Sequence, residues 1–230
     1  MRKQIKLTLT VAAALAAFAG TTTQAATLIT TSGPNIGGNA PVSAADLLNG
    51  LAPTASSGTF TNESSGGISF LTDGLSNVAN ATVAGISSGS FLTYTLTGSA
   101  TGYDITSIDA FSGWADFGRA NPEVRFSYSL ISDPLNFIIL GTNVETAFNN
   151  DNGAGDVYVR VTVADDTQPN LATGVAALRF DFPDQQNGFV GYRELDAFGT
   201  PTAVPEPSTY LMMLGGLATL VIFRRRSRVA

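Results

Sequence analysis

The chain contains neither cysteine nor histidine. Without cysteine it can form no disulfide, so a folded domain must rest on its own packed core or on bound ions. Without histidine it cannot build a Ser-His-Asp or Cys-His catalytic centre, and the familiar zinc sites are excluded as well. Among hydrolytic chemistries, carboxylate-pair catalysis of the glycosidase type stays open.

Lysine is nearly absent, and most basic residues gather at the two ends of the chain. Of the 12 lysines and arginines, seven lie within residues 1–6 and 224–230. Residues 26–203 therefore hold five arginines against 17 carboxylates, a net charge of −12. Such a surface repels nucleic acid and anionic lipid and attracts cations, calcium above all. Simple solubility explains the same acidity equally well.

The N-terminus has the pattern of a secretory signal peptide. Arg2, Lys3 and Lys6 precede an apolar stretch at 7–20, and small residues lead up to Ala25. This order predicts a signal peptide over residues 1–25 that signal peptidase removes after Ala25.

The C-terminus, residues 204–230, combines a proline-rich box, one apolar run and a basic end. Residues 209–223 would span about 22 Å as a helix, less than the ~30 Å of a hydrocarbon core, so they would cross only by thinning the bilayer or by snorkelling of their flanks. The arginines that follow would stay cytoplasmic. A buried core helix is the alternative, but it has no need of a basic end. The elements in order are Pro205, Glu206 and Pro207, the span at 209–223, and Arg224, Arg225 and Arg226.

This order of elements resembles a PEP-CTERM sorting tail. The resemblance implies an exported bacterial protein that is anchored in the inner membrane by its C-terminal span. It further implies that an exosortase-type protease cuts near the box and releases the protein to the cell surface or the exopolysaccharide matrix.

The body between the two ends has the pattern of an all-β domain. Apolar residues alternate over 124–130 and 157–163, as in strands with one buried face, and Gly, Pro, Asn and Asp separate the segments. No stretch keeps a helical period, so we expect one antiparallel sandwich or barrel over residues 66–203. Residues 26–65, rich in Gly, Ser, Pro and Asn, predict a loosely ordered lead-in. Further strands are expected at 68–71, 91–97, 105–111, 137–140, 176–182 and 190–198.

Motifs at both ends of the body suggest a family. Leu71-Thr72-Asp73-Gly74 lies early, residues 191–199 (GYRELDAFG) close the body, and Gly118-Arg119 precedes the strand at 124–130. The arrangement resembles the galactose-binding-like jelly roll of discoidin domains and many carbohydrate-binding modules, over about residues 66–199. The resemblance implies an antiparallel jelly-roll sandwich in which the Asp-Gly turn meets a glutamate of the last strand.

The same resemblance implies a structural calcium ion where those two motifs meet. Asp73 and Glu194 would be its side-chain ligands, together with backbone carbonyls, and calcium takes six to eight such oxygens. The alternative is that Asp73 only forms the turn with Gly74 while Glu194 pairs with an arginine.

A ligand-binding segment is expected in a loop at one end of the sandwich. Trp114, the only tryptophan, lies close to Asp116 and Arg119. Sugars are commonly bound by an aromatic ring, on which the apolar face of the sugar stacks, and by polar side chains that make paired hydrogen bonds to its hydroxyls. Alternatively, Trp114 belongs to the core and Arg119 pairs with a nearby aspartate.

Three functions are compatible with these patterns. The favoured one is a noncatalytic surface module that binds a carbohydrate of the exopolysaccharide. The second is a ligand-free, acidic matrix protein that gathers calcium. The third, a carboxylate-dependent glycosidase, would need two acids facing each other across a cleft, and the acids here are scattered through turn sequences. We therefore expect no enzyme.

Overall fold

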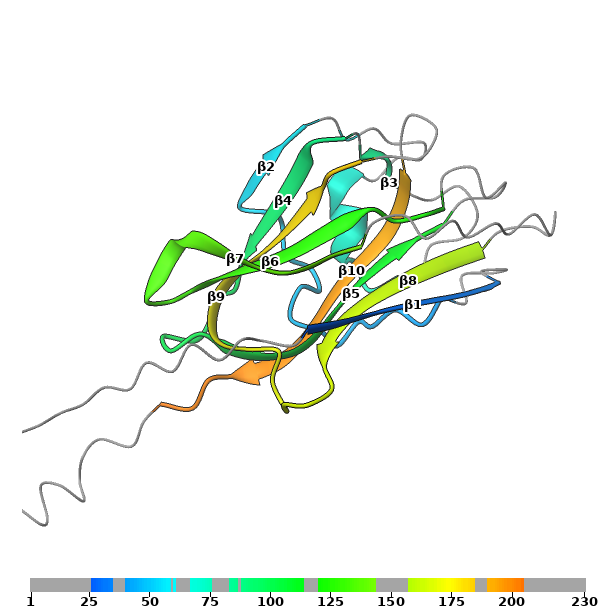
Figure 1. The fold of residues 1–230 in the computed structure, drawn as a ribbon. Coiled ribbons are helices and arrows are strands. Elements are labelled where there is room, and N and C mark those ends of the chain that lie inside the picture. The colour runs from blue at the N-terminus through cyan, green and yellow to red at the C-terminus, as the bar shows by residue number, and fades with distance from the viewer. Residues whose placement is uncertain are drawn as a thin grey trace, which may run out of the picture.

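The computed structural model describes residues 26–34, 40–58, 60, 67–75, 83–86, 88–113, 120–143, 157–184 and 190–204. They form ten strands and one short 3-10 helix, η1 (Gly67–Thr72), arranged as in Figure 1. All the strand pairings are antiparallel, so the predicted all-β antiparallel sandwich is confirmed. The expected signal peptide and most of the C-terminal tail lie outside the described residues.

The strands form two layers that share one corner. The corner is the pairing of Tyr103 with Val175 and of Ile105 with Ala172. The first layer has the order β3 (Val83–Ile86), β10 (Val190–Pro201), β5 (Tyr103–Ser112), β8 (Val157–Asp165) and β1 (Ala26–Pro34). The second has the order β2 (Ala55–Ser57), β4 (Ser90–Thr95), β9 (Ala172–Phe182), β6 (Val124–Leu130) and β7 (Asp133–Asn143).

The core lies between the layers and follows the alternation of the sequence. In β9, Leu178 and Phe180 are buried in the core, whereas Arg179 and Asp181 between and after them are partly exposed. The two layers meet directly where the ring of Phe182 packs on that of Tyr192, with centroids 4.7 Å apart. Burying each such side chain contributes roughly 1.5–3 kcal/mol. The strands contribute these core residues: Leu92, Tyr94, Phe126, Leu178 and Phe180 from the second layer, and Ile108, Ala110, Val161, Val163, Leu195 and Ala197 from the first.

The segment that we expected to be a loosely ordered lead-in differs from that expectation. Its start is β1, which pairs with β8 from Ala26 opposite Asp165 to Pro34 opposite Val157. Farther along, β2 pairs with β4, and Leu48 is fully buried in the core. Besides Leu48, the side chains of Leu28, Leu47, Leu51 and Phe60 pack against the core. The prediction from composition was wrong because backbone pairing and a few apolar contacts order a segment that is otherwise rich in Gly, Ser, Pro and Asn.

One local expectation is wrong, and another is confirmed within a longer strand. The segment 68–71, expected to be a strand, lies in the 3-10 helix η1 because it leads directly into the turn at Asp73. The strand expected at 137–140 is part of the longer β7, whose register against β6 jumps from Asp133 opposite Leu130 to Ile138 opposite Tyr128. The residues between form a bulge, which a period-two pattern cannot reveal.

Candidate functional site

The structure brings Asp73 and Glu194 together, although they lie at opposite ends of the body. Gly74 donates its backbone N–H to Oε1 of Glu194 at 3.0 Å, so the Asp-Gly turn sits directly against β10. The carboxylate of Asp73 accepts the N–H of Leu75 at 2.9 Å, which closes the turn. We call Asp73, Gly74 and Glu194 the turn–strand site.

Glycine at position 74 is required by this geometry. Its φ is +72°, a conformation that other residues rarely adopt. A Cβ added there would lie 2.7 Å from the Cβ of Ala44. The segment around Ala44 therefore packs tightly against the turn and holds it on β10.

Glu194 is buried and only partly satisfied. The residue is fully buried, and its Oε2 has no hydrogen-bond partner. Burial, together with the negative charges of Asp196, Asp73 and Asp46, raises the pKa of Glu194 to about 9 despite the hydrogen bond from Gly74, which lowers it. Among the residues that the structure describes, Glu194 forms no ion pair. Pairing with an arginine, the alternative reading of the sequence, is therefore not found in this part of the chain.

More acids line the same strand. Asp196 is fully buried and lies opposite Asp109 of β5 in the register. Burial also raises the pKa of Asp196 to about 7, and its Oδ2 accepts the N–H of Ser43 at 2.9 Å. Asp109 is compensated by Arg160, whose Nη2 lies 2.5 Å from its Oδ2. Like charges directly opposite each other on neighbouring strands are destabilising, so the negative charge of the Asp109–Asp196 pair needs a compensating cation or proton.

Asp46 ties the N-terminal segment to the same strand. Its Oδ1 accepts the N–H groups of Leu48 and Ala197, and the N–H of Leu47 bonds to the carbonyl of Ala197. Burial raises the pKa of Asp46 as well. Two carboxyl groups with raised pKa, those of Asp46 and Asp196, therefore join β10 to the N-terminal segment, and a third, that of Glu194, joins β10 to the turn at Gly74. A cation beside them would favour their ionised forms, because an opposite charge lowers the pKa of an acid.

The carboxylates of the turn–strand site are of the type that binds a cation, but they do not form a dense cluster of acidic ligands. Oε2 of Glu194 is an available oxygen, and calcium binds carboxylate and carbonyl oxygens without strict geometry. In the described ranges, however, no group of three or more acidic side chains is arranged to hold a metal. Backbone carbonyls would have to supply most of the ligands.

Trp114, Asp116 and Arg119 lie outside the described residues, but the chain on either side of them is described. The hydroxyl of Ser112 donates to the carbonyl of Ala120 at 2.5 Å, so both flanks of the segment start from one place. That place is the end of β5, where Val159 at the start of β8 and Tyr192 of β10 lie opposite Ser112. The flanks of the segment are therefore fixed at one end of the sandwich.

Comparison with known proteins identifies the C-terminal tail. Residues 203–228 match the family model of the PEP-CTERM protein-sorting motif. The chain carries a PEP-CTERM sorting motif. The resemblance of the tail is thereby confirmed, and the motif marks the chain for export and for processing by an exosortase. Within the part of the chain that the structure describes, no helix has the length and apolar character of a membrane span. The span expected at 209–223 lies outside that part.

The body was compared with solved structures and with curated proteins. One similar structure is CBM32-1 from a family 31 glycoside hydrolase of Clostridium perfringens, at 14% identity and a TM-score of 0.42, covering 66% of this chain and 99% of that one. A second is CpGH89CBM32-5 from the same organism, in complex with GalNAc-beta-1,3-galactose, at 16% identity and a TM-score of 0.39, covering 75% and 94%. No curated protein matches the chain.

Sequence reasoning missed Asp46, Asp109 and Asp196 at this site. A signal for Asp196 was present, because it follows Glu194 by two residues and must share its strand face. Asp109 could be placed only by the register of β5 against β10. Nothing local indicates Asp46, which reaches β10 from 151 residues away along the chain. The sorting motif, in contrast, is wholly local and was readable from its own residues.

Proposed function

We propose that this chain is an exported cell-surface protein whose sandwich is a noncatalytic carbohydrate-binding module. The observation that carries the proposal is the junction at the C-terminus. The last described strand, β10, ends at Pro201, and the sorting motif begins at residue 203. Cleavage near Pro205 and Pro207 would release the sandwich with all ten strands intact, to the surface or into the exopolysaccharide.

The position of the acids supports a noncatalytic role. A glycosidase needs two carboxyl groups that face each other across a cleft open to its substrate. The acids whose pKa is most strongly raised, Glu194 and Asp196, are fully buried, Glu194 against the turn at Gly74 and Asp196 against Ser43. A polysaccharide chain cannot reach them there.

For the carbohydrate contact we propose Trp114, Asp116 and Arg119. Their support is the sequence pattern together with the tied flanks at Ser112 and Ala120, which fix both chain ends at one end of the sandwich. An aromatic face beside paired polar groups is the arrangement that sugars require.

For the turn–strand site we propose a structural calcium ion, bound by Asp73 and Glu194. The buried Oε2 of Glu194 without a partner supports it, because an unpaired buried carboxylate is costly unless an ion or a proton compensates it. The ion would hold the Asp-Gly turn on β10. It would also offset part of the acidity of the body.

The experiment is a binding assay with the full chain in mild detergent. The fluorescence of Trp114, the only tryptophan, is followed while exopolysaccharide from the producing bacterium and a panel of neutral polysaccharides are added. We expect saturable quenching by at least one polysaccharide, competition by its free sugar, and loss of binding in Asp116→Ala. A chain that no polysaccharide quenches or pulls down is a ligand-free matrix protein instead.

A further inference from the structure

The outer face of the second layer carries one polar row that crosses four strands. The register places Phe91 of β4 opposite Asp181 of β9, Asp181 opposite Arg125 of β6, and Arg125 opposite Thr142 of β7. Residues in register on neighbouring strands point to the same face. The next residues along these strands, Leu92, Phe180 and Phe126, are in the core, so this row faces outward. We call Phe91, Asp181, Arg125 and Thr142 the cross-strand row.

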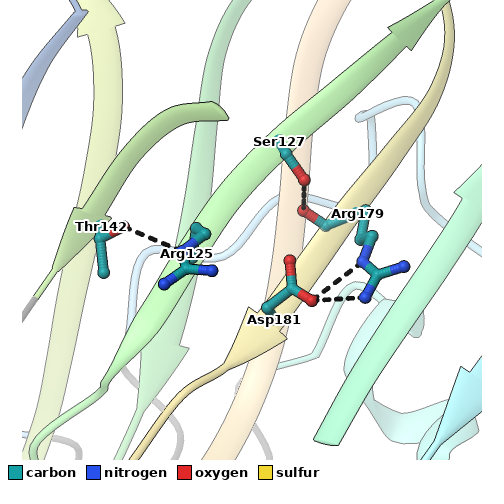
Figure 2. A network of polar contacts seen from close by, with 5 residues as sticks. All are labelled: Arg125, Ser127, Thr142, Arg179 and Asp181. Carbon is teal, nitrogen blue, oxygen red and sulfur yellow. Dashed lines mark hydrogen bonds and ion pairs between the residues drawn. The ribbon is translucent and has the colours of Figure 1, made fainter. Parts of the chain in front are cut away.

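One side of the row is held rigidly by Arg179. Its Nε and Nη2 both donate to Oδ1 of Asp181, at 2.9 and 2.7 Å (Figure 2). Its guanidinium carbon lies 3.8 Å from the ring centroid of Phe91. Phe137 of β7 approaches the same guanidinium at 5.7 Å. Ser127 donates to the carbonyl of Arg179 and fixes β6 against β9. The charge of Asp181 is therefore neutralised through Oδ1, while Oδ2 accepts no hydrogen bond from the described residues and remains an acceptor.

Arg125 stands in the middle of the row without a carboxylate. Although it lies opposite Asp181 in the register, its Nε donates to Oγ1 of Thr142 at 3.2 Å instead, as Figure 2 shows. Among the described residues it forms no ion pair, whereas Arg160 and Arg179 each have an aspartate. The residue is partly exposed, so its two terminal nitrogens remain available as a donor pair. An arginine without a carboxylate is unexpected in a body with 17 acids and five arginines.

We propose that the cross-strand row is a second saccharide-binding surface, separate from the segment 114–119, and that it takes a sugar bearing a carboxylate, such as a uronate. The terminal nitrogens of Arg125 match a carboxylate with two parallel hydrogen bonds. Oδ2 of Asp181 accepts a hydrogen bond from a neighbouring sugar hydroxyl. Thr142 and Arg179 keep both groups in place, because each already contacts one of them.

The acidity of the body does not prevent this contact. The Debye length at physiological ionic strength is about 8 Å, so exposed carboxylates farther away are largely screened. The acid nearest to Arg125 in the register, Asp181, is already paired with Arg179. Together with Arg179, the row has two arginines against one aspartate, so its local charge is positive.

The test is titration of the full chain with oligogalacturonate and with a neutral oligosaccharide of the same length. Arg125→Gln should weaken oligogalacturonate binding by about tenfold or more, since a charge-assisted contact is worth roughly 1.4 kcal/mol or more. Arg125→Lys should retain only part of the affinity for oligogalacturonate, because lysine cannot form two parallel hydrogen bonds to a carboxylate. Gln168→Glu, an exposed position away from the row, makes the same change in net charge and should bind like wild type.

Several results would overturn the proposal. Unchanged binding in Arg125→Gln, or equal losses in Arg125→Gln and Gln168→Glu, would show that the row is not the contact. Competition by sulfate as effective as by galacturonate, at equal ionic strength, would reduce the row to a simple anion site. Neutral polysaccharides that bind through Trp114 should be unaffected by Arg125→Gln, so failure here and failure of the proposed function are distinguishable. Thermal unfolding of each variant verifies that it is folded.

Discussion

The backbone amide of Gly74 donates a hydrogen bond to the carboxylate of Glu194, 120 residues later in the chain. This contact joins the turn after η1 to the middle of β10. It places a buried carboxylate where one oxygen is bonded and the other is not. The stability of the sandwich should therefore depend on the charge of that group and on the fit of the turn.

We expect the folded state to lose stability as the pH rises. The pKa of Glu194 is raised from 4.5 to about 9, and that of Asp196 from 3.8 to about 7. The folded state thus keeps protons that the unfolded state releases, and stability falls by up to about 1.4 kcal/mol per pH unit for each such group. Urea unfolding between pH 5.5 and 9 in a chelating buffer should show a falling midpoint.

Two further measurements test whether Glu194 causes this fall of the unfolding midpoint with pH, which we call the pH slope. Glu194→Gln cannot ionise, so it should flatten the slope above pH 7 and abolish calcium binding in a calorimetric titration. Saturating calcium should also flatten the slope in the wild type, because the ion favours the ionised carboxylate. A midpoint that stays constant over this pH range in the chelating buffer would contradict the assigned burial of Glu194.

Gly74→Ala should destabilise the protein more than Gly50→Ala. Both glycines have positive φ, +72° and +74°, so each substitution costs roughly 1–2 kcal/mol of backbone strain. Only at Gly74 would the new methyl group also meet Ala44, at 2.7 Å, whereas nothing lies within 4 Å of it at Gly50. Denaturant unfolding measures the difference. Equal losses in the two variants would show that the turn does not pack against Ala44.

Leu48→Ala tests whether the N-terminal segment belongs to the folded core. Leu48 is fully buried in the core cluster, so truncation should lower the free energy of unfolding by about 2–5 kcal/mol. Leu135→Ala is the matched control, since Leu135 is 92% exposed and its loss should change the stability by less than about 0.5 kcal/mol. A Leu48→Ala variant as stable as this control would support the original prediction that residues 26–65 are loosely ordered.

Removal of residues 204–230 should separate sorting from folding. The last described contacts of the chain are those of Thr202, which donates to Gly102 and to Asp104. The truncated protein should therefore unfold within about 0.5 kcal/mol of the full chain, while cell fractionation finds it no longer retained at the membrane and surface. Retention without the tail would mean that the sorting motif is not used.

The sequence predicts the local parts of this molecule well. The alternation over 157–163 is reproduced in β8, where Val159, Val161 and Val163 are buried and the residues between them are partly exposed. The segment 124–130 forms β6 as predicted, but its Ser127 and Ser129 are buried as well. The family resemblance predicts that the Asp73-Gly74 turn meets Glu194, and Gly74 does bond to Glu194, whereas the calcium ion there stays a prediction. Both results depend on patterns that extend over a few residues.

The remaining features depend on register between distant strands. Arg125 and Asp181 share a row only because β6 pairs with β9, and Asp46 reaches Ala197 only because its segment packs along β10. No local pattern encodes these pairings. The bulge in β7 belongs to the same class, since it shows only when the partner strand is known.

The place of β10 in its sheet also sets the order in which the protein can be completed. This strand lies between β3 and β5, not at an edge, yet it is the last of the described strands. Until β10 is in place, β3 and β5 have no strand between them, and the first layer is incomplete. The sandwich can therefore close only after the residues next to the sorting motif have been exported. The motif at 203–228 thus follows directly after the segment that finishes folding. A tail held at the membrane would give the newly exported chain time to close before release.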